Sequence, residues 1–208
     1  MMPRAWFLKT VVLLTGICLS LSACESLGQT RVAIREERLP DREKSIRAFA
    51  TVASVLLSPR CLNCHVRGDS PLQGDAETPH PMNVKRGPDG RGQAAMRCTN
   101  CHQAENSSEP HGPRGREGWR LPPPTMRLAW QGLSIGELCQ SIKDPRTNGN
   151  RTLAELLEHV RDDPFVNWGW NPGAGRTTPP VSHEEFVTAV VLWAESGASC
   201  PQPATEPR

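Results

Sequence analysis

Apolar residues return every three or four positions in the stretch that follows Asp41. They are Ile46, Phe49, Ala50, Ala53, Leu56 and Leu57. This spacing places them on one face of a helix, and Asp41 is a suitable N-cap because its carboxylate accepts hydrogen bonds from free N–H groups. Ser58-Pro59 predicts the end of this helix, since proline disfavours a helical conformation in the residue before it.

Three later stretches begin as capping boxes, in which a serine or threonine is followed three positions later by a glutamate. The pairs are Ser134 with Glu137, Thr152 with Glu155, and Ser182 with Glu185. Apolar residues at helical spacing follow each pair: Leu138 and Ile142, then Leu156, Leu157 and Val160, then Phe186, Val187, Val190, Val191 and Trp193. Gly197 is the expected C-cap of the last helix. The patterns therefore predict at least four helices.

Residues 67–97 and 109–124 are rich in glycine, proline and charge and show no periodicity. The chain has 20 Pro, 17 Gly and only 37% hydrophobic residues among its 208, so its side chains offer little apolar surface for a core. Loops this long are unusual in a compact domain unless something orders them. We expect one mainly α domain over 41–200, with long ordered loops, little or no sheet, and a flexible tail over 201–208.

Two short runs carry the chemistry: Cys61-Leu62-Asn63-Cys64-His65 and Cys98-Thr99-Asn100-Cys101-His102. Each reads C-x-x-C-H, the attachment sequence of a c-type haem. Two thiols three positions apart can each form a thioether to one porphyrin edge, and the next residue then brings an imidazole to the iron. With 6 His in the chain, both pairs would be followed by His by chance about once in a thousand.

Other interpretations of the two cysteine pairs are a zinc ribbon, a thioredoxin-like redox site and structural disulfides. Ribbon pairs are typically about 15 to 20 residues apart, and the gap between Cys64 and Cys98 is longer. A redox C-x-x-C follows a strand, and neither run has a β-rich stretch before it. At these residues the chain resembles the c-type cytochromes. The resemblance implies a cytochrome c-like fold organised by two covalent haems, with His65 and His102 as proximal ligands.

The N-terminus has the features of a signal peptide over 1–23. Arg4 and Lys9 precede an apolar run over 11–21 that is too short to span a bilayer. Leu21-Ser22-Ala23-Cys24 resembles the bacterial lipobox, which implies cleavage before Cys24 and a lipid on its thiol; an ordinary signal peptide or a retained anchor are the alternatives. Residues 24–40 then serve as a tether. We expect the periplasmic side of a bacterial membrane, and Glu25 favours the outer membrane by analogy with enteric sorting.

Export also bears on the remaining cysteines and on charge. After Cys18, Cys24 and the four motif cysteines are assigned, Cys139 and Cys200 remain, and an oxidising compartment favours a disulfide over two free thiols. Cleavage removes two basic residues and leaves 22 basic and 22 acidic side chains. A nucleic-acid partner would require a basic surplus, so none is expected.

Each iron also needs a distal ligand or an open position. His80, in Pro79-His80-Pro81, and His111, in Pro110-His111-Gly112, are the preferred candidates because proline and glycine hold a loop imidazole at low entropy cost. Met126, in a proline-rich run after the second motif, is the alternative for the second haem, and Met82 and Met96 are weaker. His159 and His183 are expected to be a partly buried surface residue and a solvated helix-start residue.

The run Trp168-Gly169-Trp170 has two interpretations, a haem-edge or docking surface and core filling. The C-terminal part is also similar to proteobacterial dihaem lipoproteins labelled isoquinoline 1-oxidoreductase subunits, which implies an electron acceptor for a periplasmic dehydrogenase. The expected function is single-electron relay between redox partner proteins. The alternatives are a dihaem peroxidase, which needs one open iron and a longer chain, and a haem-based sensor or assembly protein.

Overall fold

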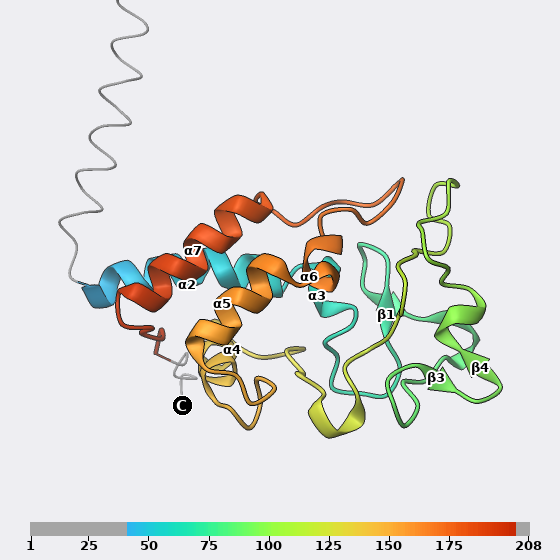
Figure 1. Ribbon diagram of the computed structural model, residues 1–208, viewed down its shortest axis with the longest axis horizontal. Helices are drawn as coiled ribbons and strands as arrows, with labels where there is room; N and C mark the ends of the chain where they lie inside the picture. Colours follow the sequence, from blue (N-terminus) through green and yellow to red (C-terminus); the bar gives the residue numbers. More distant parts are fainter. Residues whose placement is uncertain (1–40, 203–208) are drawn as a thin grey trace, which may run out of the picture. The chain divides into compact units, whose positions relative to one another are not determined.

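The computed structural model describes residues 41–202, in which helices pack together and loops carry both C-x-x-C-H runs (Figure 1). The α-helices are α2 (Asp41–Leu56), α3 (Pro59–Leu62), α4 (Ile135–Lys143), α5 (Leu153–Asp162), α6 (Pro164–Trp168) and α7 (His183–Glu195). Short 3-10 helices are η1 (Pro81–Asn83), η2 (Cys98–Asn100) and η3 (Pro124–Met126). The prediction of a mainly helical chain is confirmed.

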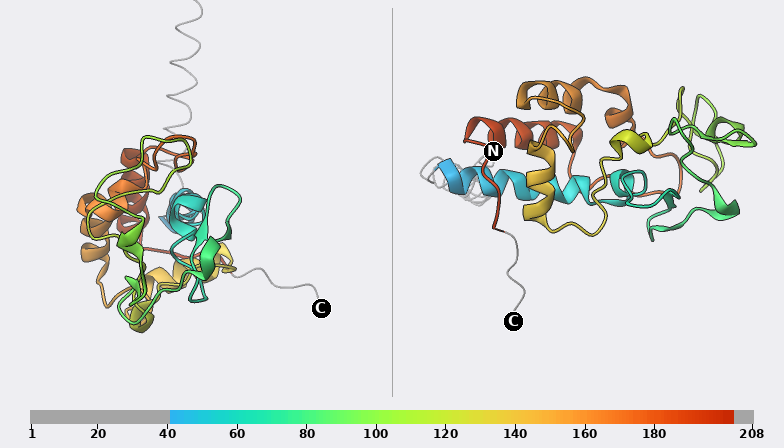
Figure 2. Two further views of the ribbon diagram at one scale, coloured as in Figure 1. Left: turned by 90° about the vertical axis from the view of Figure 1, so that its right-hand side faces the viewer. Right: turned by 90° about the horizontal axis from the view of Figure 1, so that it is seen from below.

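The core lies where α2 meets α7, two helices that run side by side although most of the chain separates them (Figures 1 and 2). The Phe49 and Trp193 rings pack with centroids 5.1 Å apart. Ser45 is fully buried there, and its hydroxyl donates to the Trp193 carbonyl at 2.9 Å and accepts from the Ser199 N–H at 2.8 Å. One side chain thus ties the first helix to the end of the last.

The three predicted capping boxes are all present, each with the serine or threonine accepting from the third N–H and the glutamate accepting from the cap N–H. The end of α7 is a Schellman motif. Gly197, at φ +96°, donates its N–H to Ala194, and Ala198 donates to Trp193. The left-handed conformation at Gly197 explains why glycine ends this helix.

Two short helices differ from the sequence expectation. Pro59 begins α3 rather than ending helical structure, because proline at the first position of a helix gives up only an N–H that would be free anyway. Cys61 consequently lies inside a helical turn. Asp163 caps α6 by accepting from the Phe165 N–H at 2.6 Å, and this Asp-Pro start was not recognised in the sequence.

The sheet is limited to two antiparallel pairs. Strand β1 (Leu72–Gln73) pairs with β2 (Thr78–Pro79), and β3 (Gly92–Gln93) pairs with β4 (Met96–Arg97). Both hairpins lie in the glycine- and proline-rich region where the sequence showed no periodicity. Each hairpin positions a residue of the candidate site, because His80 directly follows β2 and Cys98 directly follows β4.

A disulfide joins Cys139 of α4 to Cys200, which follows α7. Cys139 is fully buried, and Lys143 of the same helix donates to the Ala198 carbonyl at 2.7 Å. The bond and this hydrogen bond hold the chain end after α7 against α4.

Removal of this disulfide is expected to lower the free energy of unfolding by about 4 kcal/mol, because it closes a long loop with 61 positions between its ends. The measurement is urea unfolding of the wild-type protein and of a Cys139→Ala/Cys200→Ala variant. An unchanged midpoint, or alkylation of both thiols in denatured, unreduced protein, would contradict the prediction.

The predicted signal peptide over 1–23, the predicted lipid site at Cys24, the predicted tether over 24–40 and most of the predicted tail lie outside the described residues. No helix among residues 41–202 is long and apolar enough to cross a membrane.

Candidate functional site

The first C-x-x-C-H run begins in α3 and ends in a turn fixed by its own backbone. The His65 N–H donates to the Cys61 carbonyl at 3.2 Å. Asn63 is fully buried, and its side-chain amide donates to the Gly74 carbonyl at 2.9 Å while its backbone carbonyl accepts from Leu72. The middle of the motif is thereby held against the β1–β2 hairpin, at strand β1 and at the turn that follows it.

The segment that precedes α4 contacts the His65 imidazole through a hydrogen bond and a stacked ring. Its Nδ1 lies 2.8 Å from the Leu128 carbonyl oxygen, and its ring stacks on Trp130 with centroids 3.6 Å apart and planes at 6°. The Trp130 N–H donates to the His65 carbonyl at 2.9 Å. Leu128 adopts φ +47°, a conformation that costs a non-glycine residue roughly 1–2 kcal/mol. Local strain therefore accompanies the alignment of this carbonyl.

The second run repeats the arrangement with different residues. The His102 Nδ1 lies 2.6 Å from the Arg114 carbonyl oxygen, and the ring stacks on Trp119 with centroids 4.5 Å apart and planes at 5°. Trp168 of α6 meets Trp119 edge to face at 4.9 Å. Each motif histidine is thus held by one backbone carbonyl and one indole.

These contacts fix the protonation of both imidazoles. A carbonyl oxygen can only accept, so Nδ1 carries the hydrogen and Nε2 keeps its lone pair. Burial lowers the pKa of His65 to about 4 and also lowers the pKa of His102, so both rings are neutral at pH 7. A neutral imidazole with its far nitrogen hydrogen-bonded to a carbonyl is the usual form of a metal-ligating histidine.

The four motif cysteines are free thiols in the structure. Burial raises the pKa of Cys61 to about 12 and raises the pKa values of Cys64 and Cys98, which keeps these three groups protonated at neutral pH. Within residues 41–202 no three His, Cys, Asp or Glu side chains converge as a metal-ion site would require.

His80 lies beside the second motif. Its ring centroid is 6.2 Å from that of His102, with the planes at 58°. The residue follows β2, its N–H donates to the Pro71 carbonyl at 3.0 Å, and its Nδ1 lies 3.0 Å from the Pro81 carbonyl oxygen. The hairpin and the two flanking prolines hold the imidazole with Nε2 as its free nitrogen.

Within the described part of the chain, the His111 ring makes no ring contact with His65 or His102. It is exposed at φ +58°, and its N–H donates to the Ala174 carbonyl at 3.1 Å. Its ring lies so close to Gly175 that a Cβ there would stand 2.9 Å from it. The Gly175 loop therefore fixes the position of this imidazole.

The other distal candidates lie elsewhere. Met126 is part of η3 and more than a third exposed. His159 of α5 is half-buried, its Nδ1 lies 3.2 Å from a carboxylate oxygen of Asp163, and burial lowers the pKa of its imidazole. His183 places Nε2 2.8 Å from the Val160 carbonyl oxygen.

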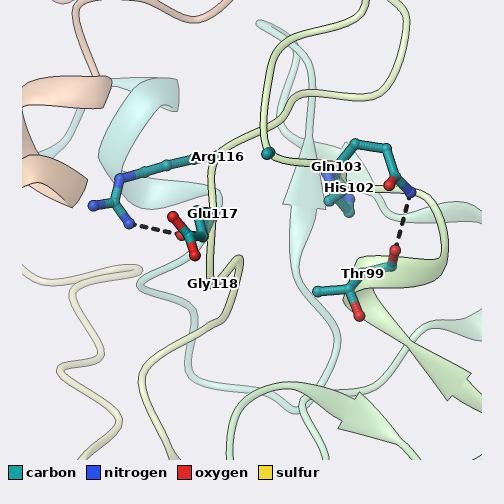
Figure 3. A pocket seen from close by; sticks show the side chains of 7 residues that line it. Thr99, His102, Gln103, Arg116, Glu117 and Gly118 are labelled. Carbon is teal, nitrogen blue, oxygen red and sulfur yellow. Dashed lines mark hydrogen bonds between the residues drawn. The ribbon is translucent and has the colours of Figure 1, made fainter.

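A shallow pocket of about 200 Å³ opens beside the second motif (Figure 3). In it the Gln103 amide donates to the Thr99 carbonyl at 3.1 Å, and Arg116 donates to the Glu117 carbonyl at 3.0 Å. The lining residues are Thr99, His102, Gln103, Ala104, Arg116, Glu117 and Gly118.

The two tryptophans of the Trp168-Gly169-Trp170 run have separate roles. Trp168 packs on the Trp119 indole that stacks on His102, and its expected role at a haem edge or docking surface stays a prediction. Trp170 donates to the Val181 carbonyl at 2.8 Å and packs 5.5 Å from Phe186, which is core filling.

Sequence reasoning missed Trp119 and Trp130, and it missed the Leu128 and Arg114 carbonyls. The available signal for Trp119 was its place in the proline-rich, aperiodic stretch 109–124, where a large aromatic residue requires something to pack against; Trp130 lies between that stretch and the capping box at Ser134. A backbone carbonyl carries no sequence signal.

A scan of protein-family models and searches of curated proteins and of solved structures found no match to this chain.

Proposed function

We propose that this protein is a dihaem c-type cytochrome that relays single electrons between redox partner proteins. The observation that supports it most strongly is the repeated arrangement of the motif histidines. In both runs Nδ1 is engaged by a backbone carbonyl, the ring is stacked on an indole, and Nε2 is free. Two separately built imidazoles with the same orientation and tautomer match two proximal ligands.

The residues present fit a haem at each motif. Cys61 with Cys64, and Cys98 with Cys101, would form the thioethers, and His65 and His102 would supply the proximal nitrogens. When bound, a haem supplies an iron that accepts or donates one electron. The chain holds each ligand nitrogen in place, keeps it unprotonated and surrounds it with apolar and aromatic side chains.

His80 is the proposed distal ligand of the haem at the second motif. Metal–nitrogen bonds of about 2 Å on each side of one iron bring two imidazole centroids to about 6 Å, and the centroids of His80 and His102 are 6.2 Å apart. His111 stays the prediction for the other iron, with Met126 as its competitor. If side chains of this chain fill the second ligand position at each haem, no site for a substrate would remain, which would favour relay over catalysis.

The setting of this relay is also a proposal. A lipid on Cys24 would anchor the domain to the periplasmic side of a bacterial membrane, where a dehydrogenase could pass electrons to it. Replacing Cys24 with serine and fractionating the cells tests the anchor: a variant that stays bound to membranes with unchanged mass would exclude it.

The mature protein is expected to carry two covalent haems. Acid–acetone extraction should leave the colour with the polypeptide, and intact mass should exceed the chain mass by two haems. A matched control is a known protein with non-covalent haem, whose colour extracts. Extraction of the colour, a mass gain of a single haem, or a gain equal to zinc would contradict the proposed function.

A further inference from the structure

Three arginine side chains are buried in the region of the two motifs. Arg60 precedes Cys61 and is 4% exposed, Arg86 lies between the two hairpins and is 0% exposed, and Arg114 follows the second motif and is 7% exposed. Arginine is almost never buried to this degree without a partner for its charge. The three come from separate parts of the chain, so their burial together is a property of the tertiary structure.

Among residues 41–202, one carboxylate forms an ion pair with these guanidinium groups. Arg60 forms an ion pair with Asp75 through Nη2, and its Nε and Nη1 have no partner. Arg114 lies over the rings of Trp119 and Trp168, 5.6 and 5.1 Å from their centroids, and its buried Nη1 is unpaired.

Arg86 is hydrogen-bonded to backbone carbonyls, and the acid within its electrostatic range, Asp69, forms its ion pair with Arg127. The Arg86 Nη groups donate to the carbonyls of Pro122, Val66 and Gly68, and its Nε has no partner. Carbonyl oxygens satisfy hydrogens but do not neutralise charge. Guanidinium groups cannot lose their proton in proteins, and an uncompensated buried charge costs several kcal/mol. Three buried guanidinium charges therefore face the carboxylates of Asp69 and Asp75, which leaves an excess of positive charge that a further anion would offset.

The cluster lies between the two motifs. The Arg114 carbonyl accepts from the His102 imidazole of the second motif. Burial lowers the pKa of Arg114, and its next largest influences are Cys64 of the first motif and Arg60. One residue thus contacts the second motif through its backbone and is within electrostatic range of the first through its side chain.

We infer that Arg60, Arg86 and Arg114 form a buried carboxylate-binding site that holds propionate groups of the haems. This inference rests on the proposed function. Guanidinium groups match carboxylates in geometry and charge, often with two parallel hydrogen bonds. The Trp168 indole, which lies under the Arg114 guanidinium, also has a buried N–H without a partner, and this N–H adds a donor for the same anions. A fixed positive charge near the iron stabilises the reduced state, so the site raises the reduction potential.

The test uses the full-length protein carrying both haems, with the haem carboxyl carbons labelled with ¹³C through labelled 5-aminolevulinate. Redox difference infrared spectra then report the propionates alone, and a redox titration gives the potentials. The variants are Arg114→Gln and Arg86→Gln. Arg146→Gln is the matched control, because Arg146 is 88% exposed and pairs only with Asp144.

We expect each buried variant to keep two haems, to shift the labelled carboxylate bands, and to reduce the equilibrium constant for reduction of one haem about tenfold, which is about 59 mV for one electron. Arg146→Gln should change neither. Arg114→Lys keeps the positive charge but lacks the planar guanidinium group, so it should shift the carboxylate bands and largely retain the reduction potential. If Arg114→Gln does not accumulate in cells, Arg114→Lys tests the inference in its place.

Two outcomes would overturn the inference. Unmoved bands and potentials in every buried variant with two haems attached would show that the propionates bind elsewhere. The second outcome is a reduction potential that changes with added inorganic phosphate in the wild-type protein but not in Arg114→Gln. That result would show that the site binds a diffusible anion instead. Wild-type protein without covalent haem contradicts instead the proposed function, so the two failures are distinguishable.

Discussion

Replacing Cys98 and Cys101 with serine should leave a protein that carries one covalent haem instead of two. The thiols of this run serve only the second motif, since His102 is held by Arg114 and Trp119 and not by the first motif. The variant should lose one haem in intact mass and about half of the haem absorbance per chain. Its Cys139–Cys200 disulfide, remote in sequence from both motifs, should be retained.

The reciprocal change, Cys61→Ser with Cys64→Ser, should also remove one haem but should destabilise the domain more. Cys61 lies on α3 and packs against the core, whereas Cys101 is exposed in a loop. The Cys139→Ala/Cys200→Ala variant is the control for cysteine loss, because it should keep both haems. If either motif variant retains two haems, or if one motif's loss removes both, the assignment of one haem to each run is wrong.

Replacing His80 with alanine should turn one ferric haem from low-spin to high-spin and leave the other largely intact. The reason is its position beside His102, with Nδ1 already engaged by the Pro81 carbonyl and Nε2 free. Visible spectra and electron paramagnetic resonance of the oxidised protein measure the change. His183→Ala is the matched control, since the Nε2 of that imidazole is occupied by the Val160 carbonyl.

The same spectra assign the other iron. His111→Ala should turn the haem at the first motif high-spin, and Met126→Ala should change neither haem. Because imidazole favours ferric iron more than a thioether does, two bis-histidine haems should titrate below a histidine–methionine cytochrome. If the ferric protein shows a near-infrared sulfur-to-iron band that disappears in Met126→Ala, Met126 and not His111 is the distal ligand of that haem. If His111→Ala leaves both haems low-spin, His159, which lies within electrostatic range of His65, is the residue to replace next.

An iron that is high-spin in the wild-type protein and binds carbon monoxide or peroxide would contradict the relay. The shallow pocket beside His102 would then be the place to look for a reacting molecule. Such a result would favour the peroxidase or sensor alternatives over electron transfer.

The sequence by itself determined the features that depend on near neighbours. The capping boxes at Ser134, Thr152 and Ser182 specify helix starts because both partners of each hydrogen bond lie within four residues. The end of α7 at Gly197 follows equally from local backbone preference. The two C-x-x-C-H runs are local in the same sense, since a short turn sets the spacing of their thiols and imidazole.

Tertiary structure alone decided what surrounds those runs. The Leu128 carbonyl meets His65 across 63 positions, and backbone carbonyls are identical in every residue, so no sequence pattern marks the one that accepts. His80 reaches His102 through a hairpin of two-residue strands, too short for any periodic signal. The buried Arg86 reads in sequence as one more surface charge, because burial depends on loops that pack around it from distant parts of the chain.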